Sequence, residues 1–169
     1  PFTAENGYAM AGSYLNGEVV DSMGGGICQV STTLYNAVLR AELEVVERSP
    51  HSMTVHYVEL SEDAAIAGTY KDFKFKNSTE YPIYIEGYTT SDKKITFNIY
   101  GKETRDSNRS ISFESVLVNE VKPNTILRDD AGQGLGYKSV SAGKTGYVAE
   151  LYKIVKVNGV QTDRIKINK

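Results

Sequence analysis

The 169-residue sequence contains one cysteine, two histidines and no tryptophan, and it lacks long apolar runs. A single cysteine excludes an internal disulfide framework and a metal site built from several cysteines. No apolar stretch approaches the roughly 20 residues that cross a membrane, and the first residues do not resemble a signal peptide. The net charge of -2 provides no basic patch for nucleic acid. We therefore expect no nucleic-acid partner and no cofactor.

The most informative stretch is the glycine run that leads into the cysteine. Gly24, Gly25 and Gly26 directly precede Ile27 and Cys28. Apolar residues then recur at helical spacing, which predicts a helix from about Cys28 to Leu43. The thiol therefore lies in the first turn, where free backbone N–H groups and the helix dipole stabilise a thiolate. The alternative is that Cys28 is a small, buried and unreactive apolar residue.

The polar residues after the cysteine favour a reactive thiol over a buried one. Gln29, Ser31, Thr32 and Thr33 are unusual neighbours for a cysteine of the core. Serine and threonine are equally typical of helix caps, so a structural role for them stays open.

A cysteine nucleophile needs a base, and the base needs a third group that orients it. His51 is our first choice of base because it follows the break at Pro50, and His56 is the alternative on a strand predicted at Met53–Val58. Asp63 and Asp72 are the candidate orienting residues. This order of residues is similar to that of papain-like and transglutaminase-like acyl-transfer sites.

Two other chemistries fit the sequence less well. Zinc binding by Cys28, His51 and an aspartate lacks ligands at paired spacing, so we expect no metal. The glycine run before a helix is also typical of phosphate loops, but no Lys-Ser/Thr follows it.

The rest of the chain is rich in predicted strands. Asn16-Gly17 indicates a hairpin, and further strands are expected at 44–47, 72–77, 81–88 and 94–100. The charge-rich segment Gly101–Arg109 marks a boundary, which divides the chain into domains at 1–105 and 106–169. The second module has a long strand at Ile111–Val121 and a hairpin around Asn158-Gly159. The predicted fold is α+β, with one helix packed on an antiparallel sheet and a small elongated all-β module after it.

Several blocks together resemble the VanW domain of bacterial envelope proteins. The resemblance covers roughly residues 1–101, and the block GGGICQVSTTLYNAV is its most specific part. The other blocks are Thr3–Tyr8, Glu47–Ser52, Asp63-Ala64 and Asp72–Asn77. Glu42 stands where the family usually has a glycine, and the chain starts inside the family pattern, so we expect an N-terminally truncated domain.

This resemblance implies a role in the bacterial cell wall. Some family members are implicated as L,D-transpeptidases, which form 3-3 cross-links through an acyl-enzyme on a cysteine. Cys28, His51, Asp63 and Asp72 match the catalytic positions, and peptidoglycan stem peptides are the expected partner. We expect substrate contacts from Gly25, Gly26, Gln29, Arg48 and Tyr35, although Arg48 is equally suited to a structural ion pair. The alternatives are a cysteine peptidase or amidase, and a non-catalytic wall-binding or scaffold protein.

Residues 106–169 resemble the glycine-marked G5-like β module of wall-associated proteins, with Gly143, Gly146 and Asn158-Gly159 at its pattern positions. This resemblance implies binding of wall glycan or of a partner. The two resemblances together predict an extracytoplasmic protein, held in the wall or anchored to the membrane through a segment outside this chain.

Overall fold

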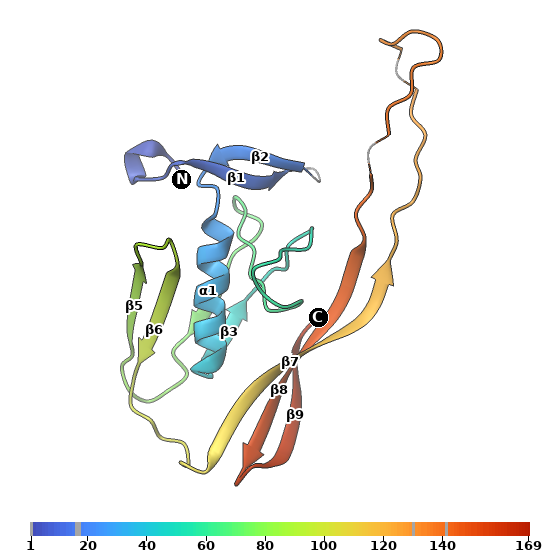
Figure 1. Cartoon of the computed structure of the whole chain (residues 1–169). Coiled ribbons are helices and arrows are strands. Elements are labelled where there is room, and N and C mark those ends of the chain that lie inside the picture. The colour runs from blue at the N-terminus through green and yellow to red at the C-terminus, as the bar shows by residue number, and fades with distance from the viewer. Residues whose placement is uncertain (1, 16–17, 130, 141) are drawn as a thin grey trace.

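The computed structural model describes residues 2–15, 18–129, 131–140 and 142–169 (Figure 1). Within these residues, a short 3-10 helix η1 (Ala4–Asn6) precedes one α-helix, α1 (Ile27–Arg40), and nine strands. The strands are β1 (Met10–Leu15), β2 (Glu18–Met23), β3 (Glu44–Glu47), β4 (Lys74–Lys76), β5 (Tyr84–Thr89), β6 (Ile95–Tyr100), β7 (Arg109–Val121), β8 (Gly146–Val157) and β9 (Val160–Asn168).

The strands form four small antiparallel sheets. Three of them are two-stranded, β1-β2, β3-β4 and β5-β6, and the fourth has the order β7-β8-β9. The predicted α+β fold with a helix packed on one antiparallel sheet is therefore wrong, because the described chain is mostly β and has no single sheet that covers α1.

The core explains why no such sheet is needed. Tyr35 and Leu39 of α1 pack with Ala64 from the loop between β3 and β4 and with Leu151 of β8. The partly buried residues around this cluster are Val45, Phe73, Phe113 and Ile167. A two-stranded hairpin is too narrow to bury a helix face by itself. Several elements therefore share the apolar stripe of α1.

The elements follow the sequence patterns closely in some places and not in others. The Asn158-Gly159 hairpin is confirmed, since these residues have φ angles of 53° and 78°, as a two-residue turn of this kind requires. The strand predicted at Met53–Val58 is wrong, because this segment is a series of bends. Its apolar residues still matter, since Val55 is buried. The β1-β2 hairpin forms, while its predicted turn at 16–17 lies outside the described residues.

The second half of the chain extends away from the helix. β7 and β8 form a long ribbon, and residues 122–129 and 131–140 continue it as an arm without strand structure (Figure 1). Leu151 nevertheless lies in the same core as Tyr35. The division at residue 105 stays a prediction. None of the helices in the described residues is long and apolar enough to cross a membrane.

Candidate active site

The glycine run fixes how the chain enters α1 and places Cys28 in the first turn. Gly26 is the N-cap of the helix and has a φ of 85°, a left-handed conformation that favours glycine. A Cβ atom on Gly25 would collide with the backbone carbonyl of Ala11 in β1. Both glycines are thus required by the backbone, and the half-buried Cys28 Sγ lies 3.3 Å from the carbonyl oxygen of Ile66.

Polar residues of α1 bind the loop that faces the cysteine. Ser31 Oγ donates to the carbonyl of Ala64 at 2.6 Å, and the Ala64 N–H donates to Thr32 Oγ1 at 3.0 Å. Asn36 Nδ2 donates to the backbone of the same loop one helical turn later, at 2.8 Å. These hydrogen bonds, of which the two at Ala64 are buried, hold the loop around residues 62–64 against the helix. The same loop carries Asp63.

Asp63 fixes His51 through both its backbone and its ring. Oδ2 of Asp63 accepts a hydrogen bond from the His51 backbone N–H at 2.6 Å and lies 2.7 Å from His51 Nδ1. A carboxylate at this position requires a proton on Nδ1. Nε2 is the ring nitrogen that remains for chemistry, and the hydroxyl of Tyr57 lies 3.4 Å from it.

Arg48 lies behind this pair. Its Nη2 donates to Oδ1 of Asp63 at 2.6 Å and its Nε donates to the Asp63 carbonyl at 2.7 Å. The side chains of Arg48 and Asp63 are only 6% and 10% exposed. The guanidinium also lies over the ring of Tyr35, 5.8 Å from its centroid. Arg48 is therefore a buried partner of the carboxylate.

The pKa values of these groups favour a thiolate and an imidazolium. Burial opposes charge on His51, but the hydrogen bonds and charges of Asp63 and Cys28 raise the pKa of His51 to about 9. Burial also disfavours the thiolate, whereas His51 and the charge of Lys71 bring the pKa of Cys28 below its usual value. The pKa of Asp63 is lowered by His51 and Arg48 against the effect of burial. Each of these shifts favours the charged form of its group: the thiolate of Cys28, the imidazolium of His51 and the carboxylate of Asp63.

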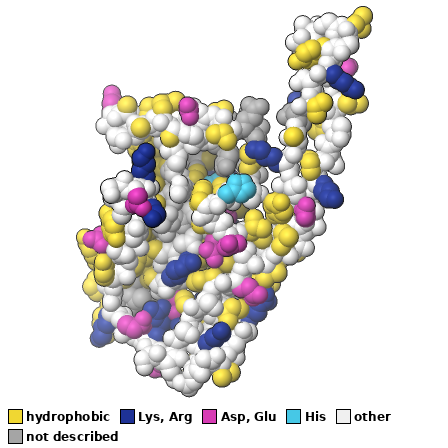
Figure 2. Space-filling view, viewed as in Figure 1, with side chains coloured by type: hydrophobic (Ala, Val, Ile, Leu, Met, Phe, Trp, Pro, Cys, Tyr) yellow, Lys and Arg dark blue, Asp and Glu magenta, His cyan; other side chains and the backbone are white. Residues whose placement is uncertain are grey.

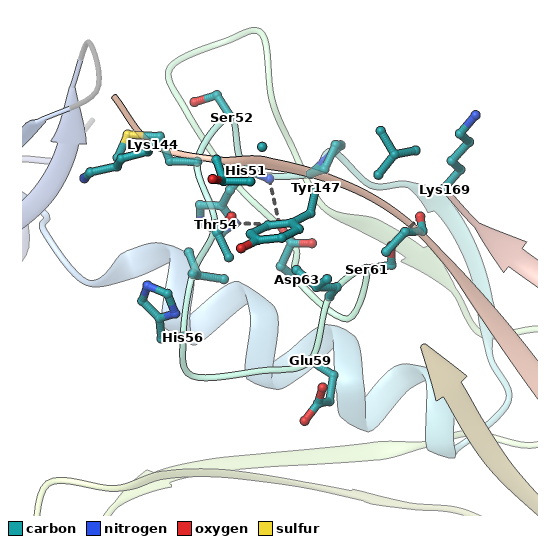
Figure 3. Close-up of a pocket in the computed structure, with 18 of the residues that line it drawn as sticks. His51, Ser52, Thr54, His56, Glu59, Ser61, Asp63, Lys144, Tyr147 and Lys169 are labelled. Carbon is teal, nitrogen blue, oxygen red and sulfur yellow. Dashed lines mark hydrogen bonds and ion pairs between the residues drawn. The ribbon is translucent and has the colours of Figure 1, made fainter. Parts of the chain in front are cut away.

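The structure brings Cys28, His51 and Asp63 together but leaves the other two candidates outside. Asp72 is exposed, where Oδ1 accepts from the Phe73 N–H at 2.8 Å and Oδ2 lies 3.5 Å from Lys74 Nζ. His56 is exposed and lies apart from the His51–Asp63 pair (Figure 3). Among the residues that the structure describes, no group of three or more His, Cys, Asp or Glu side chains is arranged to hold a metal ion.

The residues expected to contact substrate lie at two depths. Gly26 and Gln29 are exposed beside the thiol and Gly25 is partly exposed. Tyr35 is only 1% exposed, and its hydroxyl accepts a hydrogen bond from Asn168 Nδ2 at 2.6 Å. Tyr35, like Arg48, therefore lies beneath the catalytic candidates rather than at the surface.

Sequence reasoning missed the residues that link the elements. The sequence does indicate a shared role for Ser31, Thr32 and Asn36, because they follow Cys28 at helical spacing and so lie on the same face of the helix. It gives no such indication for Asn168. It lies at the end of β9, donates to both Tyr35 and the Ser61 carbonyl, and is distant from both in sequence.

Figure 2 shows a histidine, a lysine and acidic side chains gathered where the body of the molecule meets the extended ribbon.

Comparisons with known proteins agree with the sequence blocks. A family model described as VanW like protein matches residues 1–100. Over 83 residues the chain is 45% identical to the "Uncharacterized protein YoaR" of Bacillus subtilis (strain 168). This alignment covers 49% of the chain and 27% of that relative, so the chain spans about a quarter of the relative's length. No solved structure matches. Since the family model covers more than half of the chain, the chain belongs to the VanW-like protein family.

Proposed function

We propose that this chain is an extracytoplasmic cysteine acyltransferase of the bacterial cell wall, and that it acts as an L,D-transpeptidase on peptidoglycan stem peptides. The observation that carries the proposal is the His51–Asp63 pair, joined at 2.7 Å, together with the mutual effect of Cys28 and His51, which lowers the pKa of the thiol and raises that of the imidazole. A nucleophile, a base and a group that orients the base are the parts that acyl transfer needs. Membership of the VanW-like family supports the cell-wall setting.

In the first half of the reaction, the Cys28 thiolate attacks the carbonyl carbon between the third and fourth residues of a donor stem. A C–S bond forms and the carbonyl oxygen becomes an oxyanion. The tetrahedral intermediate then collapses, the C–N bond to the terminal amino acid breaks, and the His51 imidazolium gives its proton to the leaving amine. A thioester on Cys28 and a neutral His51 remain.

The start of α1 is suited to hold the oxyanion. The backbone N–H groups of Ile27 and Gln29 are engaged by the carbonyls of Gly24 and Gly26, at 3.3 and 3.0 Å. The N–H of Cys28 bonds to none of the described residues. It lies at the positive end of the helix dipole, beside the attacked carbonyl, as an oxyanion donor should.

In the second half, an amine of a neighbouring stem attacks the thioester. The new C–N bond forms, the amine proton passes to neutral His51, and the C–S bond breaks. This step restores the thiolate and the imidazolium, so atoms and charges balance over the cycle.

The test is intact-protein mass spectrometry after incubation with a stem tetrapeptide. We expect a covalent adduct equal to the donor minus its terminal amino acid, and we expect no adduct with Cys28→Ala. A second amine in the reaction should convert the adduct into cross-linked peptide. Release of free tripeptide in the presence of that amine would instead indicate a peptidase or amidase. No adduct at any pH between the pKa values of thiol and imidazolium would favour a non-catalytic wall-binding protein.

A further inference from the structure

A groove with a volume of about 840 Å³ opens beside His51, and the described residues that line it include none of α1 (Figure 3). One wall is the segment that follows Pro50, including His51, Thr54 and Val55. The opposite wall is the first part of β8, from Gly146 to Ala149. His51 and Asp63 line the groove, whereas Cys28 does not. The groove therefore leads to the base and not directly to the nucleophile.

The β8 wall offers an open strand edge to the groove. β9 pairs with β8 only from Leu151 onward, so among the described residues 146–150 pair with β7 alone. The carbonyl of Ala149 accepts a hydrogen bond from Ser61 Oγ at 2.8 Å, which shows that this edge faces the loop that carries Asp63. Backbone groups of alternate residues point to the same edge, so those of Tyr147 face the groove as well.

Two lysines stand at opposite ends of the groove in Figure 3. Lys144 precedes β8 and Lys169 follows β9. Neither forms a direct ion pair with another residue in the described part of the chain, although the charge of Lys169 also acts on Glu150, whose hydrogen-bonded partner is Lys166. Glu59 also lines the groove, but the two ends carry cations. A cation at each end, with a backbone edge between them, is complementary to an extended peptide that carries carboxylates.

We propose that this groove binds the acceptor stem peptide, which lies extended along the β8 edge with its carboxylates at Lys144 and Lys169. Main-chain hydrogen bonds to Tyr147 hold the peptide, and its amine faces His51, which takes the proton as the amine attacks the thioester on Cys28. The donor then occupies the other side of His51, at the start of α1. This inference rests on the proposed acyl transfer, because it assigns one of the two substrates of that reaction.

Binding is measured first, without chemistry. The probe is a fluorescein-labelled stem tetrapeptide, titrated into Cys28→Ala protein and followed by fluorescence anisotropy. Lys144→Glu and Lys169→Glu should each raise the Kd by about fivefold, as loss of an exposed ion pair and its replacement by repulsion predict. The matched control is Lys156→Glu, an equal charge change at an exposed position near the other end of β8. Equal weakening by all three variants, or none by the two groove variants, would overturn the proposal.

Strand pairing has its own readout. Hydrogen exchange of the Tyr147 amide, followed by NMR in the same protein, should slow when the peptide binds, while amides of the β8-β9 turn should not change. Binding that leaves the exchange of Tyr147 unchanged would contradict pairing with this edge.

Kinetics separate this inference from the acyl transfer itself. In protein with Cys28 intact, the lysine variants should form the donor adduct at the normal rate but need about five times more acceptor amine to discharge it. Slower adduct formation with a normal acceptor dependence would assign the groove to the donor and overturn the proposal. If the intact protein forms no adduct, the acyl-transfer proposal fails, and the binding comparison alone decides whether the groove holds a stem peptide.

Discussion

Asp63 holds His51 at two points, because a single oxygen, Oδ2, accepts from the backbone N–H and from Nδ1 of the same histidine. The two contacts measure 2.6 and 2.7 Å and together fix both the position and the ring orientation of His51. The carboxylate also sets the tautomer, since it requires the Nδ1 proton. His51 is thus placed by its contact with one residue twelve positions later in the chain.

Asp63→Asn should impair the chemistry while Asp72→Asn should not. The amide removes the charge that raises the pKa of His51, so less imidazolium is available to stabilise the thiolate. We expect the rate of adduct formation with a stem tetrapeptide to fall by about 100-fold or more, as loss of an orienting carboxylate does elsewhere. Asp72 is exposed and bonds its own neighbours, so Asp72→Asn is the control. Equal rates in the two variants would contradict this assignment.

The sequence predicted that Cys28 and His51 are the central residues of the candidate site, but it did not predict the geometry around them. The glycine run before Cys28 and the apolar stripe after it are both local patterns. The start of the helix could therefore be predicted from residues 24–38 alone. The choice between Asp63 and Asp72 could not, because it depends on how the loop after β3 folds back onto α1. Ser31 and Thr32 fix that loop through its backbone at Ala64, and such contacts leave no spacing in the sequence.

We expect Arg48 to hold Asp63 in position and not to contact the substrate. Arg48→Ala leaves the Asp63 carboxylate buried with one partner fewer, which costs about 3 kcal/mol of unfolding free energy for a buried pair. Arg48→Lys restores the charge but not the two donors that reach Asp63 Oδ1 and its carbonyl.

The readout for Arg48 combines chemical denaturation with kinetics. Both variants should lower the stability and the maximal rate of adduct formation, and Arg48→Lys should recover part of the stability. The concentration of stem peptide at half-maximal rate should stay unchanged. A rise in that concentration with normal stability would show that Arg48 contacts the substrate instead.

The pH dependence of alkylation reports the charge state of Cys28. Since the pKa of the thiol is lowered, the rate with iodoacetamide should reach half its maximum at a lower pH than the rate of an ordinary, unperturbed cysteine does. Adduct formation with the stem peptide should decline again as the pH rises through about 9, because His51 then loses the proton that the leaving amine needs. Asp63→Asn should shift the alkylation curve upward. An unshifted curve at the ordinary thiol value would contradict the ion pair.

The fold was harder to predict from the sequence than the residues of the candidate site, for a physical reason. The apolar stripe of α1 predicted a buried face but not what covers it. Tyr35 and Leu39 are covered by Ala64 and by Leu151, which comes from a strand more than 100 residues later. Strand patterns likewise predicted β7, β8 and β9 but not that β8 extends beyond β9 and exposes an edge, since that depends on register.

Glu42 joins α1 to the β7-β8 ribbon and makes the stability depend on pH. It ends the helix with a φ of 58°, a conformation that favours glycine. Its carboxylate binds three cations, Arg105, Arg109 and Lys153, at distances of 2.5 to 3.0 Å. The hydrogen bond from Arg109 is the largest cause that lowers the pKa of Glu42, to about 2. The ion cluster offsets the strain that a glycine would avoid.

Two substitutions separate the strain from the charge. Because the folded pKa is depressed, the stabilisation is complete above about pH 4.5 and is lost as the pH falls toward about 2. Glu42→Gln keeps the strained backbone and loses the charge, so its unfolding free energy should fall by about 2 kcal/mol at pH 7 and vary less over that window. The unfolding free energy of Glu42→Gly should be about 1 kcal/mol higher than that of Glu42→Gln, because glycine relieves the backbone strain. Denaturant unfolding at several pH values measures both, with the exposed Glu80→Gln as control. Parallel pH profiles for wild type and Glu42→Gln would show that this cluster does not couple the helix to the ribbon.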